Sequence, residues 1–416
     1  MRDAVLTIGA GLLQVPNIDI ARSLGLACIV SDRNPQAPAV ALADAYLPAD
    51  IYDTSAHLAG LPELQKRYRI VGVFGQGIDA ETTVAEVAAY LGLPGIPPEV
   101  ARACKNKARM RAILNDQPET EGPGYQWLGP IPALETRDLA EAREWADAWT
   151  GGWRRPIMVK AVDNCASRGT HRVDRADGLL AALADAMANS TTGTALLEQY
   201  LDGDQQSVEI LFDADGCCHR LNIVDRHFDG VMELGHVNPT RLGVFERNRL
   251  FEMTRAAAQA LGVRFGAFKA DTILTDGGPR ILEVTARLSG GFDCQYTTPL
   301  ATGRNFIRAA MALACGLPLD AADLEHKHRR YAAAWTAFPA PGRVTRIRPV
   351  AEVLQAHPAV RNLFLRVREG EVIPEYEHCA QRPLFVIADG ADYFAAMLGA
   401  KDGALAAAGL IETEAI

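Results

Sequence analysis

Two acidic residues, Asp271 and Glu283, have the types and the spacing of a site for a divalent cation. Each lies in an apolar run, 267–274 and 280–284, and the Gly-rich segment Thr275–Pro279 between the runs predicts a tight turn. Two strands joined in this way form a hairpin, which sets both carboxylates near one another on one face. Neighbouring carboxylates raise each other's pKa, and a bound cation removes that cost. Mg²⁺ prefers oxygen ligands and shares them with substrate phosphates, so the sequence predicts a Mg²⁺ site, with Mn²⁺ as the alternative metal.

Lys160 is a second candidate because it ends the apolar run 157–161. An ammonium group buried there without an anionic partner is costly. The loop 163–170 that follows is rich in small residues, and the backbone N–H groups of such a loop can surround phosphate oxygens. These features predict a phosphate site, and the structural alternative is a plain hairpin.

A glycine turn near the N-terminus allows a different interpretation. Gly9 and Gly11 follow the first apolar run, and Asp32 follows the second, which is the order of a dinucleotide-binding fingerprint. Gln14 stands where the third glycine of that fingerprint belongs. An NAD-dependent oxidoreductase is therefore one hypothesis, and a tight strand–helix turn in any doubly wound sheet is the other.

In the first hundred residues, predicted strands alternate with predicted helices. This alternation predicts a parallel sheet. After the helices and strand of residues 100–190, the pattern changes to that of an antiparallel sheet, so the fold class is α/β and α+β. Three domains are expected: 1–98; 99–330, divided into 99–193 and 194–330; and 331–416. The expected strands are 4–8, 27–31, 70–74, 157–161, 195–199, 207–212, 221–224, 267–274 and 280–284, and the expected helices are 19–24, 80–91, 100–114, 137–149, 178–188, 250–261 and 393–408.

Composition excludes several classes of protein. The formal net charge is −9 without a long basic run, which argues against a nucleic-acid partner. No apolar run is long enough to span a bilayer, and the first residues lack the pattern of a signal peptide. The eight cysteines are scattered without a CxxC pair, so reduced thiols and a cytoplasmic location are expected.

Taken in order, the motifs resemble the ATP-grasp superfamily, in particular its carboxylate–amine ligase branch, which is L-amino-acid ligase-like and related to biotin carboxylase. The resemblance covers essentially the whole chain. It implies an ATP-grasp fold with an N-terminal, Rossmann-like parallel-sheet domain and a C-terminal lid-like subdomain. The segments that carry it are 73–97, 105–111, 156–160, 163–170, 196–203, 233–239, 283–291, 337–342 and 366–374.

The resemblance also implies roles for individual residues. ATP and Mg²⁺ are the expected cofactors. Lys107 and Lys160 would hold phosphates, Thr285 replaces the usual Asn as a third metal ligand, and Arg287 and Lys160 would be catalytic. The phosphate loop would contribute Ser167, Arg168 and Gly169; the backbone of Glu198, Gln199 and Leu201 would contact adenine; and Gln205 would contact ribose.

Two segments bear on the substrate. The stretch from Glu233 to Pro239 resembles the E-x-G-H-x-x-P segment of amino-acid ligases, and small residues follow Arg287. Loop stabilisation and turn formation are the structural alternatives. The residues expected at the substrate are Glu233, His236, Arg287, Ser289, Gly290 and Gly291.

The expected activity is ATP-dependent joining of a small-molecule carboxylate, activated as an acylphosphate, to an amine. The habit of the family suggests a homodimer. A carboxylase of the biotin or purine-biosynthesis type that uses bicarbonate is the first alternative, and a non-catalytic nucleotide-binding protein is the second.

Overall fold

The N-terminal residues form a parallel sheet because their strands are short apolar runs buried on both faces. The computed structural model describes residues 1–117, 121–122, 125–126 and 130–416. The sheet has the order β3-β2-β1-β4, in parallel, which confirms the predicted parallel sheet. The elements are β1 (Arg2–Ile8), α1 (Val15–Ser23), β2 (Ala27–Asp32), β3 (Ala45–Pro48), α2 (Thr54–Leu64), β4 (Tyr68–Phe74) and α3 (Glu81–Tyr90).

The predicted helix 100–114 is in fact two helices, α4 (Pro98–Lys105) and α5 (Lys107–Asn115). Asn106 between them has an extended backbone, and its side-chain oxygen accepts a hydrogen bond from the N–H of Arg109 at 2.8 Å. Asn is a favoured N-cap residue, so Asn106 can begin a new helix. The helical spacing of apolar residues continues across the break, which is why periodicity alone predicted one helix.

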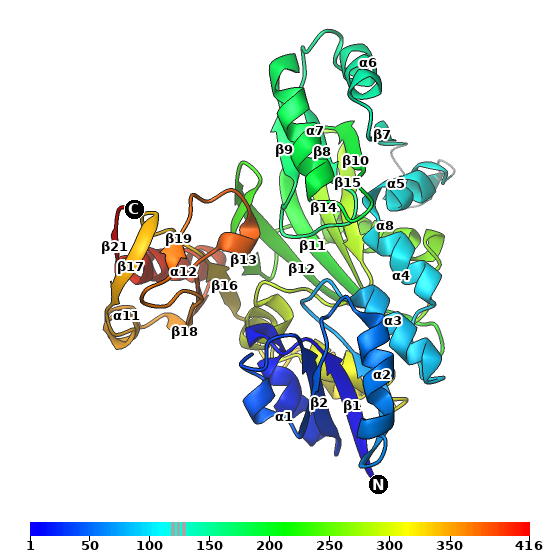
Figure 1. Ribbon diagram of the computed structural model, residues 1–416, viewed down its shortest axis with the longest axis vertical. Helices are drawn as coiled ribbons and strands as arrows, with labels where there is room; N and C mark the ends of the chain where they lie inside the picture. Colours follow the sequence, from blue (N-terminus) through cyan, green and yellow to red (C-terminus); the bar gives the residue numbers. More distant parts are fainter. Residues whose placement is uncertain (118–120, 123–124, 127–129) are drawn as a thin grey trace.

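A small antiparallel sheet with the order β7-β10-β8-β9 forms the upper lobe in Figure 1. It contains β7 (Ala133–Thr136), β8 (Ile157–Ala161), β9 (Thr170–Val173) and β10 (Ala195–Gln199), with α6 (Leu139–Thr150) and α7 (Leu179–Ala188) beside it. The strand 195–199 was expected in the same antiparallel sheet as the later strands. This prediction was wrong, because β10 pairs with β7 and β8. A separate short hairpin joins β5 (Glu121–Gly122) to β6 (Tyr125–Gln126).

The large sheet has the order β15-β14-β11-β12-β13-β16-β20-β18 and continues across the predicted boundary at residue 330. Its first half contains β11 (Asp204–Phe212), β12 (Cys218–Asp229), β13 (Met232–Asn238), β14 (Gly266–Thr275) and β15 (Gly278–Thr285), with α8 (Val244–Ala260) packed on it. The segment 232–238 was expected between strands and is itself a strand. The domain boundaries themselves stay a prediction.

Strands from the C-terminal part extend the same sheet through the pairing of β13 with β16. They are β16 (Tyr331–Trp335), β18 (Val360–Leu365) and β20 (Leu384–Gly390), and α12 (Tyr393–Ala408) packs against them. A three-stranded sheet with the order β19-β17-β21 completes this part, on the left of Figure 1. The remaining elements are α11 (Ala351–Ala356), β17 (Gly342–Ile347), β19 (Val372–Ile373), β21 (Ile411–Glu414) and the short turns η1 (Leu12–Gln14), η2 (Val40–Leu42), η3 (Ala176–Gly178), η5 (Ala321–Asp323) and η6 (Cys379–Gln381).

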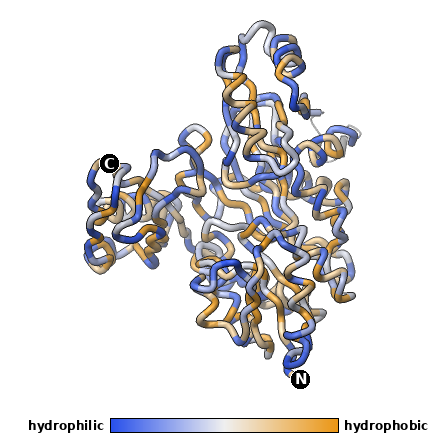
Figure 2. Tube along the Cα trace, viewed as in Figure 1, coloured by the Kyte–Doolittle hydropathy of each residue, from blue (hydrophilic) through white to orange (hydrophobic). Residues whose placement is uncertain are grey.

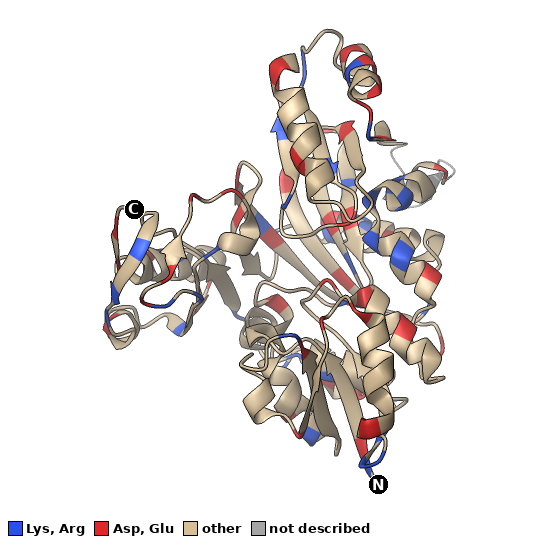
Figure 3. Ribbon diagram, viewed as in Figure 1, with Lys and Arg blue, Asp and Glu red and all other residues tan. Residues whose placement is uncertain are grey.

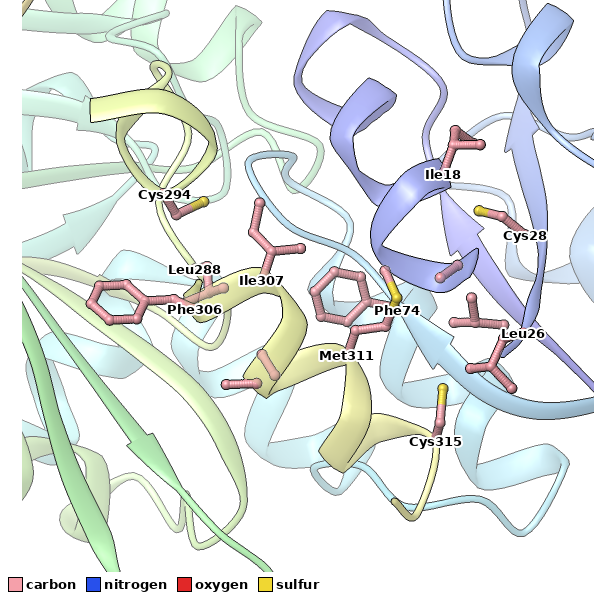
Figure 4. Close-up of a cluster of buried hydrophobic side chains, with 14 of the residues drawn as sticks. Ile18, Leu26, Cys28, Phe74, Leu288, Cys294, Phe306, Ile307, Met311 and Cys315 are labelled. Atoms are coloured by element: carbon pink, nitrogen blue, oxygen red, sulfur yellow. The ribbon is translucent and has the colours of Figure 1, made fainter. Parts of the chain in front are cut away.

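The N-terminal sheet is attached to the rest of the molecule by α10 (Phe306–Ala314), which follows the turn η4 (Asp293–Thr297) and α9 (Thr298–Thr302). Figure 4 shows Phe306, Ile307 and Met311 of α10 in one buried cluster with residues of α1, β2 and β4. Figure 2 colours the chain by hydropathy and shows hydrophobic residues along many of the strands and helices and hydrophilic residues on many connections. This apolar contact holds the two parts together and thereby fixes the loops between them.

Replacing Phe306 with Ala tests this attachment. Phe306 is fully buried. Truncating such a side chain leaves a cavity, and we expect a loss of about 3–5 kcal/mol in the free energy of unfolding. Phe394→Ala is the matched control, since Phe394 is 57% exposed; its cost is expected to be within about 0.5 kcal/mol. Urea denaturation measures both, and equal losses would contradict the assigned role of Phe306.

Candidate active site

A pocket between the small and the large sheet brings together most of the predicted nucleotide and metal residues. Lysine, arginine and carboxylate side chains from both sheets face it. Figure 3 shows acidic and basic segments on neighbouring strands of the large sheet. The predicted residues that line the pocket are Lys107, Lys160, Ser167, Glu198, Gln199, Leu201, Gln205, Asp271 and Glu283.

Glu198 is buried between two cations in this pocket. Its carboxylate contacts Lys160 Nζ and lies 3.1 Å from Arg111 Nε, and Arg111 also donates to the carbonyl of Leu282 at 2.9 Å. Burial by itself would raise the pKa of Glu198, but Lys160 and Arg111 lower it below its ordinary value. The side chain of Glu198 therefore anchors Lys160, whereas only a backbone role was predicted for Glu198. Arg111, which the sequence reasoning missed, is the other anchor.

The hairpin of β14 and β15 places Asp271 directly opposite Glu283, which confirms the predicted juxtaposition. Asp271 forms ion pairs with Arg226 Nη1 at 2.9 Å and Lys269 Nζ at 2.7 Å, and Glu283 lies 3.4 Å from Lys107 Nζ. Burial would raise the pKa of Glu283, but Lys107 and three further cations lower it to about 2. Glu283 is thus ionised at neutral pH, as a metal ligand must be.

These oxygen atoms fit a Mg²⁺ ion. Thr285 is on the same strand as Glu283, and its Oγ1 is buried without a hydrogen-bond partner in the part of the chain that the structure describes. Within the described ranges there is no group of three or more His, Cys, Asp or Glu that could hold a metal. Mg²⁺ does not require one, because it commonly binds through one or two carboxylates, waters and substrate phosphates. The metal roles of Asp271, Glu283 and Thr285 stay a prediction.

The loop 163–170, which was predicted to bind phosphate, has a backbone that few side chains tolerate. Ala166, Ser167 and Gly169 all have left-handed φ values, of 56°, 61° and 64°. A Cβ on Gly169 would lie only 2.8 Å from that of Asn189, so glycine is required there. Strained backbone of this kind is typical of functional sites. Arg168 does not line the pocket, because its Nε donates to Asn164 Oδ1 at 2.8 Å within the loop.

Ser167 ties this loop to two other parts of the chain. Its hydroxyl donates to the carbonyl of Val231 at 2.9 Å, and its Oγ lies 3.4 Å from Cys379 Sγ. Val231 is in the turn between β12 and β13, and Cys379 belongs to the C-terminal part. The loop is therefore held against the pocket by residues that the sequence reasoning did not connect to it.

The predicted substrate residues do not line the pocket. Glu233 pairs with Arg226 Nε at 2.8 Å and Arg382 Nη1 at 3.4 Å, and these arginines outweigh burial and hold its pKa well below the usual range. His236 is buried, its Nε2 lies 3.0 Å from Thr297 Oγ1, and burial lowers its pKa. These contacts give both residues a clear structural role.

Arg226 connects the predicted metal site to the predicted substrate segment. It contacts Asp271 and Glu233 at once and lies opposite Gln205 in the β11–β12 register. The predicted strand 221–224 is shorter than β12, so Arg226 was not among the predicted site residues. The alternation of side chains along a longer strand was the signal that could have found it.

The segment after Arg287 lies where the two parts of the molecule meet. Ser289 N–H donates to Glu209 Oε1 at 2.7 Å, and a Cβ on Gly290 would lie 3.2 Å from the backbone of Gly77. Arg287 is half-buried, and its Nε has no hydrogen-bond partner among the described residues. Burial lowers the pKa of Arg287, but Glu81 and Asp79 raise it above its ordinary value. Gly290 thus serves a close backbone contact. Gly291 has a left-handed φ of 65° in open space.

The N-terminal glycine turn favours the structural alternative over a dinucleotide site. Asp32 Oδ2 accepts from the N–H of Ala10 at 3.1 Å, and Oδ1 accepts from Asn34 at 2.9 Å. The Gln14 amide donates to the carbonyl of Gln76 at 2.7 Å. Asp32 thus stabilises a tight strand–helix turn.

Comparison with known proteins agrees with this geometry. The family described as "ATP-grasp domain" matches residues 153–295. An L-amino acid ligase from Bacillus licheniformis has the same fold, with a TM-score of 0.79 at 23% identity over all of both chains. The chain therefore carries an ATP-grasp domain and has the ATP-grasp fold, with an N-terminal parallel sheet and antiparallel sheets. ATP-grasp proteins in general bind ATP with Mg²⁺.

Two proteins are similar to this chain in amino-acid sequence. The chain is 25% identical to carnosine synthase 1 from Gallus gallus over 345 residues, which are 76% of this chain and 35% of that protein. It is 36% identical to dapdiamide A synthase from Enterobacter agglomerans over 97 residues, 22% of each. The chain thus spans about a third of the length of the first relative and about a fifth of the second. In the part of the chain that the structure describes, no helix has the length and apolarity needed to cross a bilayer.

Glu209 makes the stability of this region depend on pH. Burial, together with the neighbouring Asp293, raises the pKa of Glu209 to about 7. The folded state therefore holds a proton that the unfolded chain releases near pH 4.3. The resulting stabilisation is fully present below about pH 4.3 and is lost as the pH rises through 7.

Glu209→Gln keeps the acceptor oxygen for Ser289 and removes the titration. The free energy of unfolding of the natural chain should fall between pH 5 and pH 8 as Glu209 loses its proton. We expect the fall in the variant to be smaller by roughly 1–3 kcal/mol. Denaturant titrations at both pH values measure this. Parallel pH profiles for the two proteins would show that Glu209 does not titrate in this range.

Proposed function

We propose that the chain is an ATP-dependent ligase that activates a carboxylate as an acylphosphate and joins it to an amine, with release of ADP and phosphate. The observation that carries the proposal is the pair Asp271 and Glu283, which lie opposite one another in a pocket that also contains Lys107 and Lys160. Carboxylates for a metal beside ammonium groups for phosphates suit phosphoryl transfer, in which positioning and electrostatics dominate.

The residues have distinct proposed tasks in nucleotide binding. Lys107 and Lys160 bind phosphate oxygens, and their pairing with Glu283 and Glu198 holds both side chains in place beforehand. The backbone of Glu198 to Leu201 lines the adenine, and Gln205 faces the ribose. Mg²⁺, bound by Asp271 and Glu283 with Thr285 nearby, would neutralise charge on the phosphates.

The proposed reaction has two steps. A carboxylate oxygen forms a bond to the γ-phosphorus of ATP as the bond to the ADP oxygen breaks. The amine nitrogen then bonds to the acyl carbon, phosphate leaves with the electrons of the broken C–O bond, and the amine loses a proton. A role for Arg287 in stabilising the negative charge of the acylphosphate stays a prediction, because Arg287 does not line the pocket in the part of the chain that the structure describes. The loop at Ser167, held by Val231 and Cys379, excludes water that would hydrolyse it.

The relatives support an amino acid as one of the substrates. Two are named as synthases, of carnosine and of dapdiamide A, and the third as an L-amino acid ligase. We accordingly propose a small-molecule carboxylate and an amine as the partners of a cytoplasmic enzyme, with no nucleic acid or membrane. A homodimer stays a prediction.

Glu283→Ala tests the metal and phosphate assignment. We expect this variant to lose substrate-dependent ADP release by at least about a hundredfold, because the charge that Glu283 contributes to the transition state is missing. The assay is ADP formation with ATP, Mg²⁺ and mixtures of amino acids, followed by mass analysis of the product.

Asp276→Ala is the control, since Asp276 is an exposed acid in the turn of the same hairpin. It should retain full turnover. Unchanged turnover of Glu283→Ala would refute the metal site. ADP release by the natural chain that depends on bicarbonate and not on amines would replace the ligase with a carboxylase, and absence of ADP release with any substrate would indicate a nucleotide-binding protein.

A further inference from the structure

A second cavity on the large sheet is lined by several arginine side chains and, among the residues that the structure describes, by no Asp or Glu. It lies between the start of β12, the helix α8, the residues after α9 and the segment that leads into β16. The guanidinium groups that line it are those of Arg220, Arg247, Arg304, Arg329 and Arg330. Such a concentration of like charge is unusual in a chain whose formal net charge is −9.

Only some of these charges are balanced by acids. Arg220 pairs with Glu252 at 2.7 Å, and Arg330 pairs with Asp389 at 2.9 Å. Among the described residues, Arg247 and Arg329 form no ion pair or side-chain hydrogen bond. Two unpaired guanidinium groups thus lie at one cavity.

Arg304 is the most buried of these cations, with 8% of its surface exposed. It forms no ion pair with any residue that the structure describes. Its guanidinium donates to the carbonyls of Leu324 at 2.7 Å, Arg220 at 3.2 Å and Leu221. These bonds and the Phe306 ring, whose centroid lies 4.7 Å from the guanidinium carbon, fix its orientation without a paired carboxylate. An anion in the cavity would be attracted to the guanidinium groups that line it.

The chemistry of the cavity indicates the class of anion. Guanidinium groups present a planar set of N–H donors that matches the oxygens of phosphate, often in pairs. Several of them around one space suit an anion with more than one negative charge. A monovalent anion would balance only a part of this charge.

The cavity is separate from the ATP pocket. The two share no lining residue, and β12 contributes Arg220 to Ile223 to one and Arg226 and Phe228 to the other. Pro239 and Thr240, at the end of the segment that resembles the amino-acid ligases, line the cationic cavity. The cavity therefore adjoins the predicted substrate segment without belonging to the nucleotide site.

We propose that this cavity binds a multivalent phosphate-bearing anion of small-molecule size, held chiefly by Arg247, Arg304 and Arg329. The inference rests on the cavity itself and does not require that the ATP pocket act as a ligase. Free inorganic phosphates and phosphorylated metabolites share this chemistry, and the probes below distinguish them.

Isothermal titration of the full chain with inorganic pyrophosphate tests the proposal. Three variants are compared with the natural chain. Arg247→Gln/Arg329→Gln removes the two unpaired charges, and Arg249→Gln is the matched control two residues along α8, outside the cavity. Lys107→Ala/Lys160→Ala disables the ATP pocket, which could also bind pyrophosphate. Thermal melts establish that each variant is folded.

We expect the Arg247/Arg329 variant to bind pyrophosphate at least about tenfold more weakly at the second site, because two charge-assisted contacts are lost. Arg249→Gln and the Lys107/Lys160 variant should keep this site. Orthophosphate should bind more weakly than pyrophosphate at the same site. If a phosphorylated metabolite such as a sugar bisphosphate binds more tightly than pyrophosphate, the ligand belongs to the class of phosphorylated metabolites. If pyrophosphate binds more tightly than the sugar bisphosphate, the ligand is a free polyphosphate.

Three results would overturn the proposal. The first is unchanged pyrophosphate binding by the Arg247/Arg329 variant. The second is an equal loss in Arg249→Gln, which would reflect overall charge only. The third is loss of all binding in the Lys107/Lys160 variant, which would place every bound anion in the ATP pocket. A short oligonucleotide that binds the natural chain more tightly than pyrophosphate, through the same arginines, would also exclude a small-molecule site.

Discussion

Charge buried between the two sheets must be balanced, and the arrangement of the site follows from that requirement. Glu198 lies between Lys160 and Arg111, Glu283 faces Lys107, and Asp271 is held by Arg226 and Lys269. Removal of one member of such a group leaves an uncompensated charge. The cations are therefore held in position by carboxylates of the chain itself, and two of these carboxylates, Asp271 and Glu283, are the groups that a metal would use.

The rest of the fold supports this arrangement from two directions. The apolar contact of α10 holds the N-terminal sheet against the segment that contains Arg287 and Ser289. The C-terminal strands extend the large sheet through β13 and β16, and so bring Cys379 and Arg382 against Ser167 and Glu233. The lid-like role expected for the C-terminal part stays a prediction.

Local features of the fold and site could be predicted from the sequence, and long-range pairings could not. The bounds of β8, β10 and α12 match the predicted runs, and the hairpin spacing correctly placed Asp271 opposite Glu283. The anchoring role of Glu198 and the bridging role of Arg226 depend on partners far along the chain, which no local pattern specifies. The break at Asn106 was hidden because a single capping side chain decides it within an unbroken apolar periodicity.

In the proposed reaction, ATP activates a carboxylate at Asp271 and Glu283, and an amine then captures the activated carboxylate. Transfer of oxygen-18 from a labelled carboxylate substrate tests it most directly. If the carboxylate attacks the γ-phosphorus, one labelled oxygen stays with phosphorus when the amine displaces it. The account predicts labelled inorganic phosphate and unlabelled ADP in amounts equal to the amide product. Unlabelled phosphate, or label in AMP, would contradict it.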